Sequence, residues 1–188
     1  YPSHFRPISL CNIFYKIIAK ILTNRMKPFL DKLISPYQSA FIPDRNIHDN
    51  ILMVQEILNI FNKSKNKKGW FALKLDMEKA YDRIEWPFLW SCLAKFGFLD
   101  QWISWIKQCV MSYSIIFNEG TSNIFTPTRG LRQGDPLSPY LFILCMEAFA
   151  RNLMLEAATP KSGLGIKLVP RSFNIPCLFF ADDSLLFC

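Results

Sequence analysis

Apolar residues recur at helical spacing in two segments near the start of the chain. In residues 11–30 they include Ile13, Ile17, Ile21 and Leu22, and Asn12 stands where a helix cap is expected. Residues 51–61 repeat the pattern, with Asn46 or Asp49 as the residue that opens the helix. The pattern predicts two amphipathic helices.

A different pattern, strict alternation, follows in WFALKLD, residues 70–76. It predicts a strand with one apolar face and with Asp76 at the end of the other face. Two short helices are expected around 86–96 and 99–111, because each carries a pair of tryptophans at helical spacing that suits core packing. Residues 113–128 favour a hairpin around Gly120.

The last third of the chain is the most apolar. Pro136 is expected to start a helix through about residue 157, apolar nearly all round and therefore buried. A strand near 165–169 is expected next, and then the strands CLFFA and SLLFC, which only two residues separate. Strands so close in sequence should form a tight hairpin. The whole pattern predicts an α+β fold in which helices separate the strands.

Composition adds limits to this picture. The chain has 188 residues, 51% of them hydrophobic, so it is long enough and apolar enough to bury a core. Its net charge of +7 weakly favours a polyanionic partner. The six cysteines lack C-x-x-C spacing and there are only two histidines, which argues against zinc and favours reduced core thiols in an intracellular protein. No uncharged apolar run is long enough for a membrane helix, so no membrane partner is expected.

Asp182 and Asp183 lie between the two closing apolar strands, at the predicted hairpin tip. Desolvating clustered carboxylates is costly unless a cation compensates. Together with Asp76 they would offer only oxygen ligands, which select Mg²⁺ before Ca²⁺, with Mn²⁺ as a substitute. Three aspartates could hold two ions roughly 3.5–4 Å apart, an arrangement that promotes displacement at phosphorus. Taken alone, two aspartates in a turn are a weak motif and favour an ordinary solvated turn.

A second segment strengthens the first interpretation. RGLRQGDPLSPYLF, residues 129–142, is a glycine-flanked loop followed directly by the start of a helix. Such a loop lets the backbone approach a ligand closely, beside a helix start suited to phosphate or sugar contacts. The order is therefore a strand with Asp76, a Gly-Gln-Gly loop with its helix, and a hairpin with two aspartates.

In this order the segments closely resemble the reverse transcriptase domain of non-LTR retroelements, the LINE type, and especially a plant lineage. LKLDMEKAYDRIEW resembles that family's motif A, RGLRQGDPLSP its motif B and FADD its motif C, while FRPISLCNIFYKIIAKILTNRM and QSAFIPDRNIHDNIL resemble its two N-terminal blocks. The resemblance covers essentially the whole chain. It implies a right-hand polymerase: partial fingers in residues 1–68 and a palm in residues 69–188, with an antiparallel palm sheet packed on helices and no thumb.

The resemblance also implies residue roles. It makes Asp76, Asp182 and Asp183 the catalytic acidic residues and metal ligands, joined by the Met77 carbonyl. It assigns nucleotide binding to a further set, in which Tyr81 stacks under the sugar and rejects a 2′-hydroxyl: Arg6, Tyr81, Gln133, Gly134 and Ala181. Arg45 and Arg132 are candidate template or nucleotide contacts. Asp44 stands in a turn where the family leads us to expect Gly, and Asp tolerates a similar conformation.

The implied activity is RNA-directed DNA synthesis by two-metal nucleotidyl transfer from a deoxynucleotide to a primer 3′-hydroxyl. The implied cofactor is a pair of Mg²⁺ ions, and the partners are an RNA template, a DNA primer and deoxynucleotides. The chain begins with Tyr1 and ends inside an apolar strand, so we expect a fragment that is inactive alone, from a parent with an upstream endonuclease that acts in the nucleus. Two alternatives stay open: an inactive degenerate copy, and a polymerase related to group II intron maturases.

Overall fold

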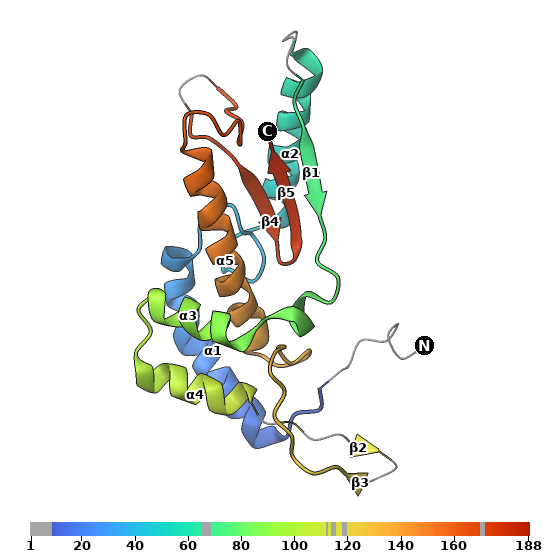
Figure 1. Cartoon of the computed structure of the whole chain (residues 1–188), viewed down its shortest axis with the longest axis vertical. Coiled ribbons are helices and arrows are strands. Elements are labelled where there is room, and N and C mark those ends of the chain that lie inside the picture. Colours follow the sequence, from blue (N-terminus) through green and yellow to red (C-terminus); the bar gives the residue numbers. More distant parts are fainter. Residues whose placement is uncertain (1–8, 65–68, 112, 114–115, 118–119, 170–171) are drawn as a thin grey trace. The chain divides into compact units, whose positions relative to one another are not determined.

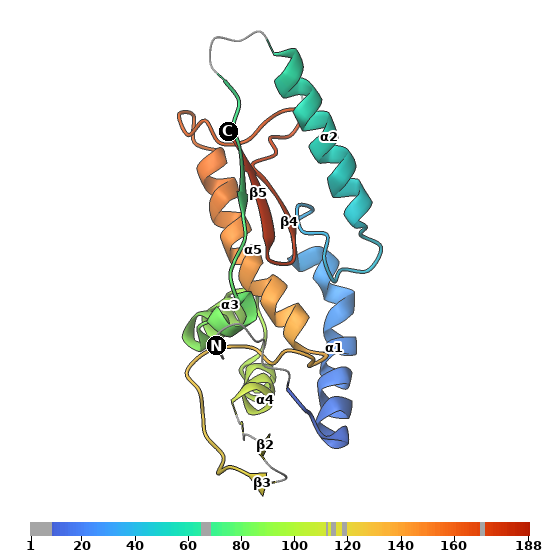
Figure 2. The same cartoon turned by 90° about the vertical axis from the view of Figure 1, so that its right-hand side faces the viewer.

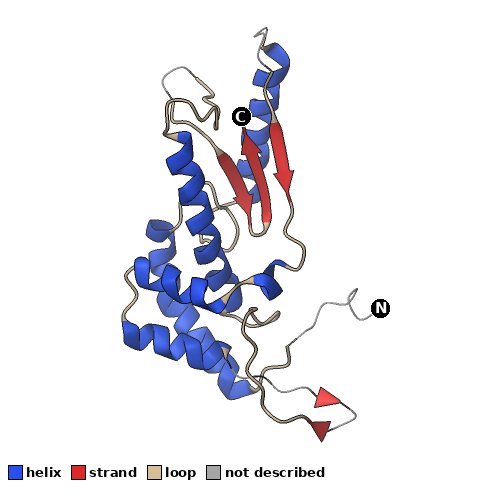
Figure 3. Cartoon of the chain, in the orientation of Figure 1, coloured by secondary structure: helices blue, strands red, loops and turns tan. Residues whose placement is uncertain are grey.

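A computed structural model describes residues 9–64, 69–111, 113, 116–117, 120–169 and 172–188 (Figure 1). Helices and short antiparallel strands make up the fold, as the α+β pattern predicted (Figure 3). The chain divides into two compact units. Unit 1 comprises Tyr1–Pro28 and Lys79–Cys145, and unit 2 comprises Phe29–Glu78 and Met146–Cys188. The predicted boundary between fingers and palm at residues 68 and 69 stays a prediction.

Helix α1 (Ile13–Leu33) begins where the sequence predicted, because the Asn12 side chain accepts the Tyr15 N–H at 2.7 Å. Of the four apolar residues used to recognise the helix, Leu22 is buried and the three isoleucines are at least half exposed. Ala19 and Met26 are buried with Leu22. The apolar spacing was therefore a correct signal for a helix and identified the buried face only in part.

The described residues of unit 1 also form further helices and a short hairpin. Two of the helices have the predicted positions, α3 (Trp86–Lys95) and α4 (Asp100–Val110), and a short 3₁₀ helix, η2 (Ala80–Arg83), precedes them. The hairpin pairs β2 (Ile116–Phe117) with β3 (Gly120–Thr121), as predicted around Gly120. Helix α5 (Ser138–Ala157) starts two residues after Pro136 and contributes to both units. Its first half is buried, as the apolar pattern predicted, whereas most of its second half is exposed or half-buried, so the prediction of burial through residue 157 was only partly right.

Unit 2 is built on a three-stranded antiparallel sheet. Its strands are β1 (Ala72–Leu75), β4 (Cys177–Phe180) and β5 (Asp183–Phe187), in the order β1-β5-β4. β4 and β5 form the predicted tight hairpin, in which Phe180 pairs with Asp183. Helix α2 (Ile47–Lys63) is capped by Asn46, one of the two predicted residues. In Figure 2 the sheet lies between α2 and the part of α5 that belongs to unit 2.

The strand predicted near 165–169 is wrong. The structure has one isolated bridge there, between Ile166 and Ile175. Gly163 and Gly165 both have positive φ, 67° and 95°, so the chain turns repeatedly where a strand needs extended backbone. Residues 63–69, KSKNKKG, follow α2, and their lysines and glycine predict a turn, but residues 65–68 lie outside the described part of the chain.

No described helix combines the length and the apolar character needed to cross a membrane.

All six cysteines are free, and four of them are buried, in line with reduced core thiols. Cys177 on β4 is fully buried, and this burial, with a smaller effect of Glu147, raises the pKa of its thiol to about 12. The unfolded thiol ionises near its ordinary value of 9.0, while the folded thiol stays neutral to higher pH. The Cys177 thiol therefore contributes fully to the free energy of unfolding below about pH 9, and this contribution is lost as the pH rises toward 12.

We expect the free energy of unfolding to fall by about 1.4 kcal/mol per pH unit from this one group in that window. Urea denaturation between pH 8 and pH 11 measures the slope. Cys177→Ala should show a shallower slope than the parent chain, although its stability at pH 8 is lower because a buried side chain is shortened. Equal slopes for the two proteins would contradict the assignment.

Candidate functional site

Asp76 and the Asp182–Asp183 turn lie at the same end of the unit 2 sheet (Figures 1 and 3). β1 ends with Leu75 paired to Ser184, so Asp76 follows directly, next to Asp183 on the neighbouring strand. Asp76 and Asp183 are exposed, and Asp182 is half-buried. Antiparallel pairing thus makes neighbours of two backbone segments that are far apart in the sequence and carry these aspartates.

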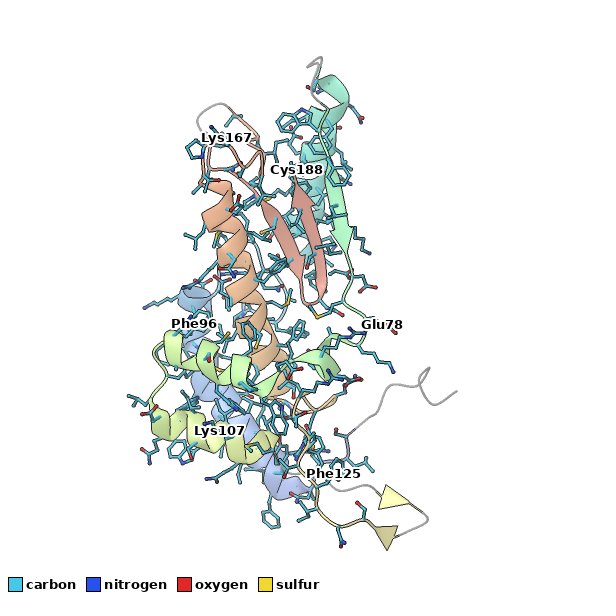
Figure 4. All side chains as sticks on the ribbon, in the orientation of Figure 1. Glu78, Phe96, Lys107, Phe125, Lys167 and Cys188 are labelled. Carbon is cyan, nitrogen blue, oxygen red and sulfur yellow. The ribbon has the colours of Figure 1, made fainter. Side chains whose placement is uncertain are left out.

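The other end of this ladder is closed by a reciprocal pair of hydrogen bonds. The Cys188 N–H donates to the Phe71 carbonyl at 2.9 Å, and the Phe71 N–H donates to the Cys188 carbonyl at 2.6 Å. Figure 4 labels Cys188 at this end and Glu78 just past the aspartate end of β1. The register of β1 against β5 is therefore fixed by backbone bonds from one end of the sheet to the other.

Asp183 has a partner that the sequence analysis did not consider. The Lys74 ammonium lies 3.2 Å from a carboxylate oxygen of Asp183. Lys74 and Asp76 lie on the same face of β1, because they are two residues apart. Lys74 pairs with Leu185 on β5, and Asp183, two residues from Leu185, lies on that same face of the sheet. Both partners of the ion pair are more than half exposed, so the pair adds little stability, about 0–1 kcal/mol. Its effect is to place a positive charge within the cluster of acidic residues.

Within the described residues, no three or more His, Cys, Asp or Glu side chains are grouped so as to hold a metal ion. The donor chemistry nevertheless fits a hard cation, since the sheet end offers carboxylates only. Met77 follows Asp76 directly, and its side chain is exposed. The assignment of Asp76, Met77, Asp182 and Asp183 as metal ligands stays a prediction.

The turn between β4 and β5 is held by Gln38, a residue that sequence reasoning missed. Gln38 is 2% exposed and accepts the Ala181 N–H at 3.0 Å, while its amide nitrogen donates to the Ala181 carbonyl at 3.3 Å. Ala181 has a φ of 55°, in the left-handed region. Its predicted nucleotide contact stays a prediction, and both of its backbone polar groups already have Gln38 as a partner. No local sequence signal joins residues so far apart.

Arg45 is held by several partners within unit 2, and its predicted template or nucleotide contact stays a prediction. Its side chain is 17% exposed and pairs with Asp31 at 2.9 Å. It also donates to the Ile34 carbonyl at 3.0 Å and the Gln38 carbonyl at 2.8 Å, so it stabilises the C-terminal end of α1 and the loop beyond it. Asp44, where the family leads us to expect Gly, has a φ of 64°, the conformation that the sequence analysis allowed.

In unit 1 the loop from 129 to 137 is hydrogen-bonded to η2 and to the residues just after it. The Leu131 N–H donates to the Tyr81 carbonyl, and the Trp86 indole donates to the Gly130 carbonyl, both at 2.8 Å. Gly130 has a φ of 96°, and a side chain there would meet the Asp82 backbone at 3.5 Å. Glycine is therefore favoured by the conformation, whereas the space beside it would accept a Cβ in ordinary contact.

Gln133 and Gly134, the predicted nucleotide contacts, lie at the tip of this loop. Gln133 is half-buried, and its backbone carbonyl accepts the Ser9 N–H at 3.1 Å. Gly134 is exposed and has a φ of 91°. Arg6, a further predicted nucleotide contact, belongs to the first N-terminal block and lies outside the described residues.

Arg132 stacks between two aromatic rings. Its guanidinium carbon lies 4.7 Å from the ring centre of Tyr15 and 4.5 Å from that of Tyr113. The Tyr15 hydroxyl donates to Asp135 at 2.8 Å, and burial, followed by the nearby Asp135 charge, raises the pKa of that hydroxyl. The predicted template contact of Arg132 stays a prediction, and its observed partners hold the loop to α1.

Tyr81, the predicted sugar contact, stacks on a core residue. Its ring centre lies 4.9 Å from that of Phe142, and the ring planes differ by 8°. Phe142 is fully buried, whereas Tyr81 is half-buried. The core thus supports the tyrosine ring on one side and fixes its orientation.

Comparison with known proteins gives a consistent result. Residues 2–188 match the family described as reverse transcriptase (RNA-dependent DNA polymerase). The Xenopus laevis transposon TX1 uncharacterized 149 kDa protein is 31% identical over 97% of this chain, which covers 14% of that protein. The Drosophila melanogaster retrovirus-related Pol polyprotein from retrotransposable element R2DM is 29% identical over 99% of this chain and 17% of its own length.

The fold is also found among solved structures. The telomerase from Candida tropicalis with a fragment of telomeric RNA superposes with a TM-score of 0.59 at 14% identity, over 93% of this chain and 29% of that one. At this identity the likeness concerns the fold alone, and it agrees with the expected polymerase architecture. The chain spans less than a fifth of the length of the two curated relatives above.

Proposed function

We propose, because this chain belongs to the reverse transcriptase family, that the protein containing it copies RNA into DNA during the movement of a non-LTR retroelement. The chain is a reverse transcriptase domain of the non-LTR retrotransposon type, as its match and its relatives show. The retrotransposon relatives favour this function over that of an intron maturase. A plant lineage stays part of the proposal.

One observation carries the proposal for the site. The β1–β5 register sets the residue after Leu75 beside the Asp182–Asp183 turn, so three acidic residues share one end of a sheet. The packing of the apolar strands does not explain why acidic residues stand at this end of the sheet. Asp76 and Asp183 are exposed, so a ligand can reach them. This supports Asp76 and Asp182 as principal catalytic ligands, with Asp183 as a third.

The reaction joins a primer 3′-oxygen to the α-phosphorus of a deoxynucleotide, and the bond from that phosphorus to the departing pyrophosphate breaks. The 3′-hydroxyl loses its proton in the step. The family works with divalent metal ions, and we propose two Mg²⁺ ions, which Mn²⁺ can replace, held by the three aspartates and the Met77 carbonyl. When bound, such ions supply positive charge that offsets the charge of the triphosphate.

The remaining residues of the proposal bind and orient. Gln133 and Gly134 would contact the nucleotide and its template base, and Arg6 the triphosphate. The template is RNA, and the primer is a nicked chromosomal end, which implies action in the nucleus. An endonuclease elsewhere in the same protein would provide that nick. These partners follow from the family resemblance, and the chain's net charge of +7 suits nucleic acid.

Primer extension by the protein that contains this chain tests the proposed function. We expect deoxynucleotide incorporation on an RNA template with Mg²⁺, and none when the metal is chelated. A well-folded protein that extends no primer on any template, with Mg²⁺ or Mn²⁺, would instead support an inactive degenerate copy.

Tyr81→Val should relax sugar selection. An aromatic ring against C2′ leaves no space for a hydroxyl, and steric overlap can cost a few kcal/mol, where each 1.4 kcal/mol is about tenfold in rate. We expect the ratio of ribonucleotide to deoxynucleotide incorporation to rise about tenfold or more, measured by competitive primer extension.

Tyr81→Phe is the matched control, since it keeps the ring that stacks on Phe142, and its ratio should equal that of the parent. A folded Tyr81→Val variant with an unchanged ratio would show that the tyrosine is only a core aromatic. In that case stability and both incorporation rates fall together.

A further inference from the structure

The tip of the β4–β5 hairpin has an unusual backbone conformation for its sequence. Its first residue, Ala181, has a φ of 55°, a region that residues with a Cβ rarely occupy. Asp182 follows it directly. A turn in this conformation needs interactions from outside the hairpin to hold it, because alanine has no side-chain group that could stabilise it locally.

Gln38 supplies these interactions from the loop after α1. Its side-chain oxygen accepts the Ala181 N–H at 3.0 Å, and its side-chain nitrogen donates to the Ala181 carbonyl at 3.3 Å. The same oxygen accepts the Ala40 N–H at 3.0 Å. Among the side chains of this size, only an amide both donates and accepts in this way. With Gln38 2% exposed, water does not readily replace these bonds.

The backbone around Gln38 is itself fixed against β4. The Phe179 N–H donates to the Tyr37 carbonyl at 2.7 Å, and the Ser39 N–H donates to the Phe179 carbonyl at 3.1 Å. Gln38 and Phe179 form a parallel bridge between these bonds. Arg45 donates to the Gln38 carbonyl at 2.8 Å. The amide of Gln38 therefore acts from an anchored position.

We propose that Gln38 is a positioning residue for Asp182, an inference that rests on the proposed function of that aspartate. The two bonds to Ala181 fix the peptide groups on both sides of its Cα. The carbonyl that Gln38 contacts belongs to the peptide that joins Ala181 to Asp182. Gln38 thereby sets the place from which the Asp182 carboxylate reaches a divalent ion, without contacting the ion, the nucleotide or the template.

Gln38→Met tests this proposal, because methionine has a similar length but neither of the two polar groups. In the 188-residue chain, hydrogen exchange should show the Ala181 amide exchanging at least tenfold faster. Mn²⁺ binding, followed by electron paramagnetic resonance, should weaken about tenfold. In the protein that contains the chain, the Mg²⁺ concentration for half-maximal primer extension should rise about tenfold, while the KM for the RNA–DNA primer-template is unchanged.

Tyr37→Phe is the matched control. It removes a hydrogen bond of 2.9 Å from the Tyr37 hydroxyl to the Asn174 carbonyl, in the same loop but away from the turn. Its Mg²⁺ dependence should equal that of the parent. An equal shift for Tyr37→Phe and Gln38→Met would overturn the proposal, because the loop would then act only through general stability.

Gln38→Leu also lacks both polar groups, and it provides a second variant should the methionine protein not fold. We expect its Mn²⁺ affinity to be lowered as well. Parent-like exchange, Mn²⁺ binding and Mg²⁺ dependence in a folded Gln38 variant overturn the positioning role. If the Gln38 variants behave like the parent but Asp182→Asn is inactive in primer extension, only the positioning role is overturned and the proposed function stands. Full activity of Asp182→Asn overturns both the positioning role and the proposed function.

Discussion

Primer extension is expected to fall about a thousandfold or more when Asp182 is replaced by Asn in the protein that contains this chain. The substitution keeps the shape of the side chain and removes the negative charge that a divalent ion needs. Metal ions contribute several kcal/mol of charge stabilisation to phosphoryl displacement, and each 1.4 kcal/mol is about tenfold in rate. Single-turnover incorporation of one deoxynucleotide measures the effect.

Folding should be almost unaffected by the same substitution. Asp182 is half-buried at a turn whose backbone is held through Ala181, and the substitution relieves repulsion between neighbouring carboxylates. Glu56→Gln, an equal change of charge at an exposed position of α2, is the matched control and should keep the parent's rate. An Asp182→Asn protein that keeps more than a tenth of that rate would contradict the catalytic assignment.

Asp135→Ala is expected to give the largest loss of stability, about 3 kcal/mol in the free energy of unfolding. The Asp135 carboxylate is 3% exposed and accepts the Tyr15 hydroxyl at 2.8 Å and the Leu137 N–H at 3.1 Å, just before α5 begins. It also accepts the Ser138 hydroxyl at 3.3 Å. Alanine would leave all three donors without their acceptor in a buried place.

Urea denaturation followed by tryptophan fluorescence suits this measurement, because Trp86, Trp90, Trp102 and Trp105 all belong to unit 1, as Asp135 does. Tyr15→Phe is the control, since it removes one of the three hydrogen bonds and should cost about 1 kcal/mol. If the two variants are equally stable, the carboxylate does not have the central role that its contacts indicate.

Local patterns predicted much of the fold. Asn12 and Asn46 cap helices as expected, because capping depends on residues within one turn. The β4–β5 hairpin was predicted from two apolar runs separated by two residues, and the structure has this hairpin. The strand predicted near 165–169 was wrong, because Gly163 and Gly165 have positive φ, which a regular strand does not allow.

The site was predicted less completely. Motif order indicated Asp76, Asp182 and Asp183, and antiparallel pairing brings their segments together. Gln38 and Asp135 act through hydrogen bonds to residues 143 and 120 positions away, and no periodicity or spacing signals such bonds. The ring contacts of Arg132 were missed for the same reason, since Tyr15 and Tyr113 come from separate segments.

The pairing of β1 with β5 has a consequence for biosynthesis. Leu75 pairs with Ser184, which the ribosome adds more than a hundred residues later. At about 5–20 residues per second, β1 waits roughly 5–20 s for its partner strand. Throughout that interval its backbone edge is open to other chains, and contacts between such distant residues form slowly. Translation speed and chaperone access between these two strands should therefore limit the yield of correctly folded domain.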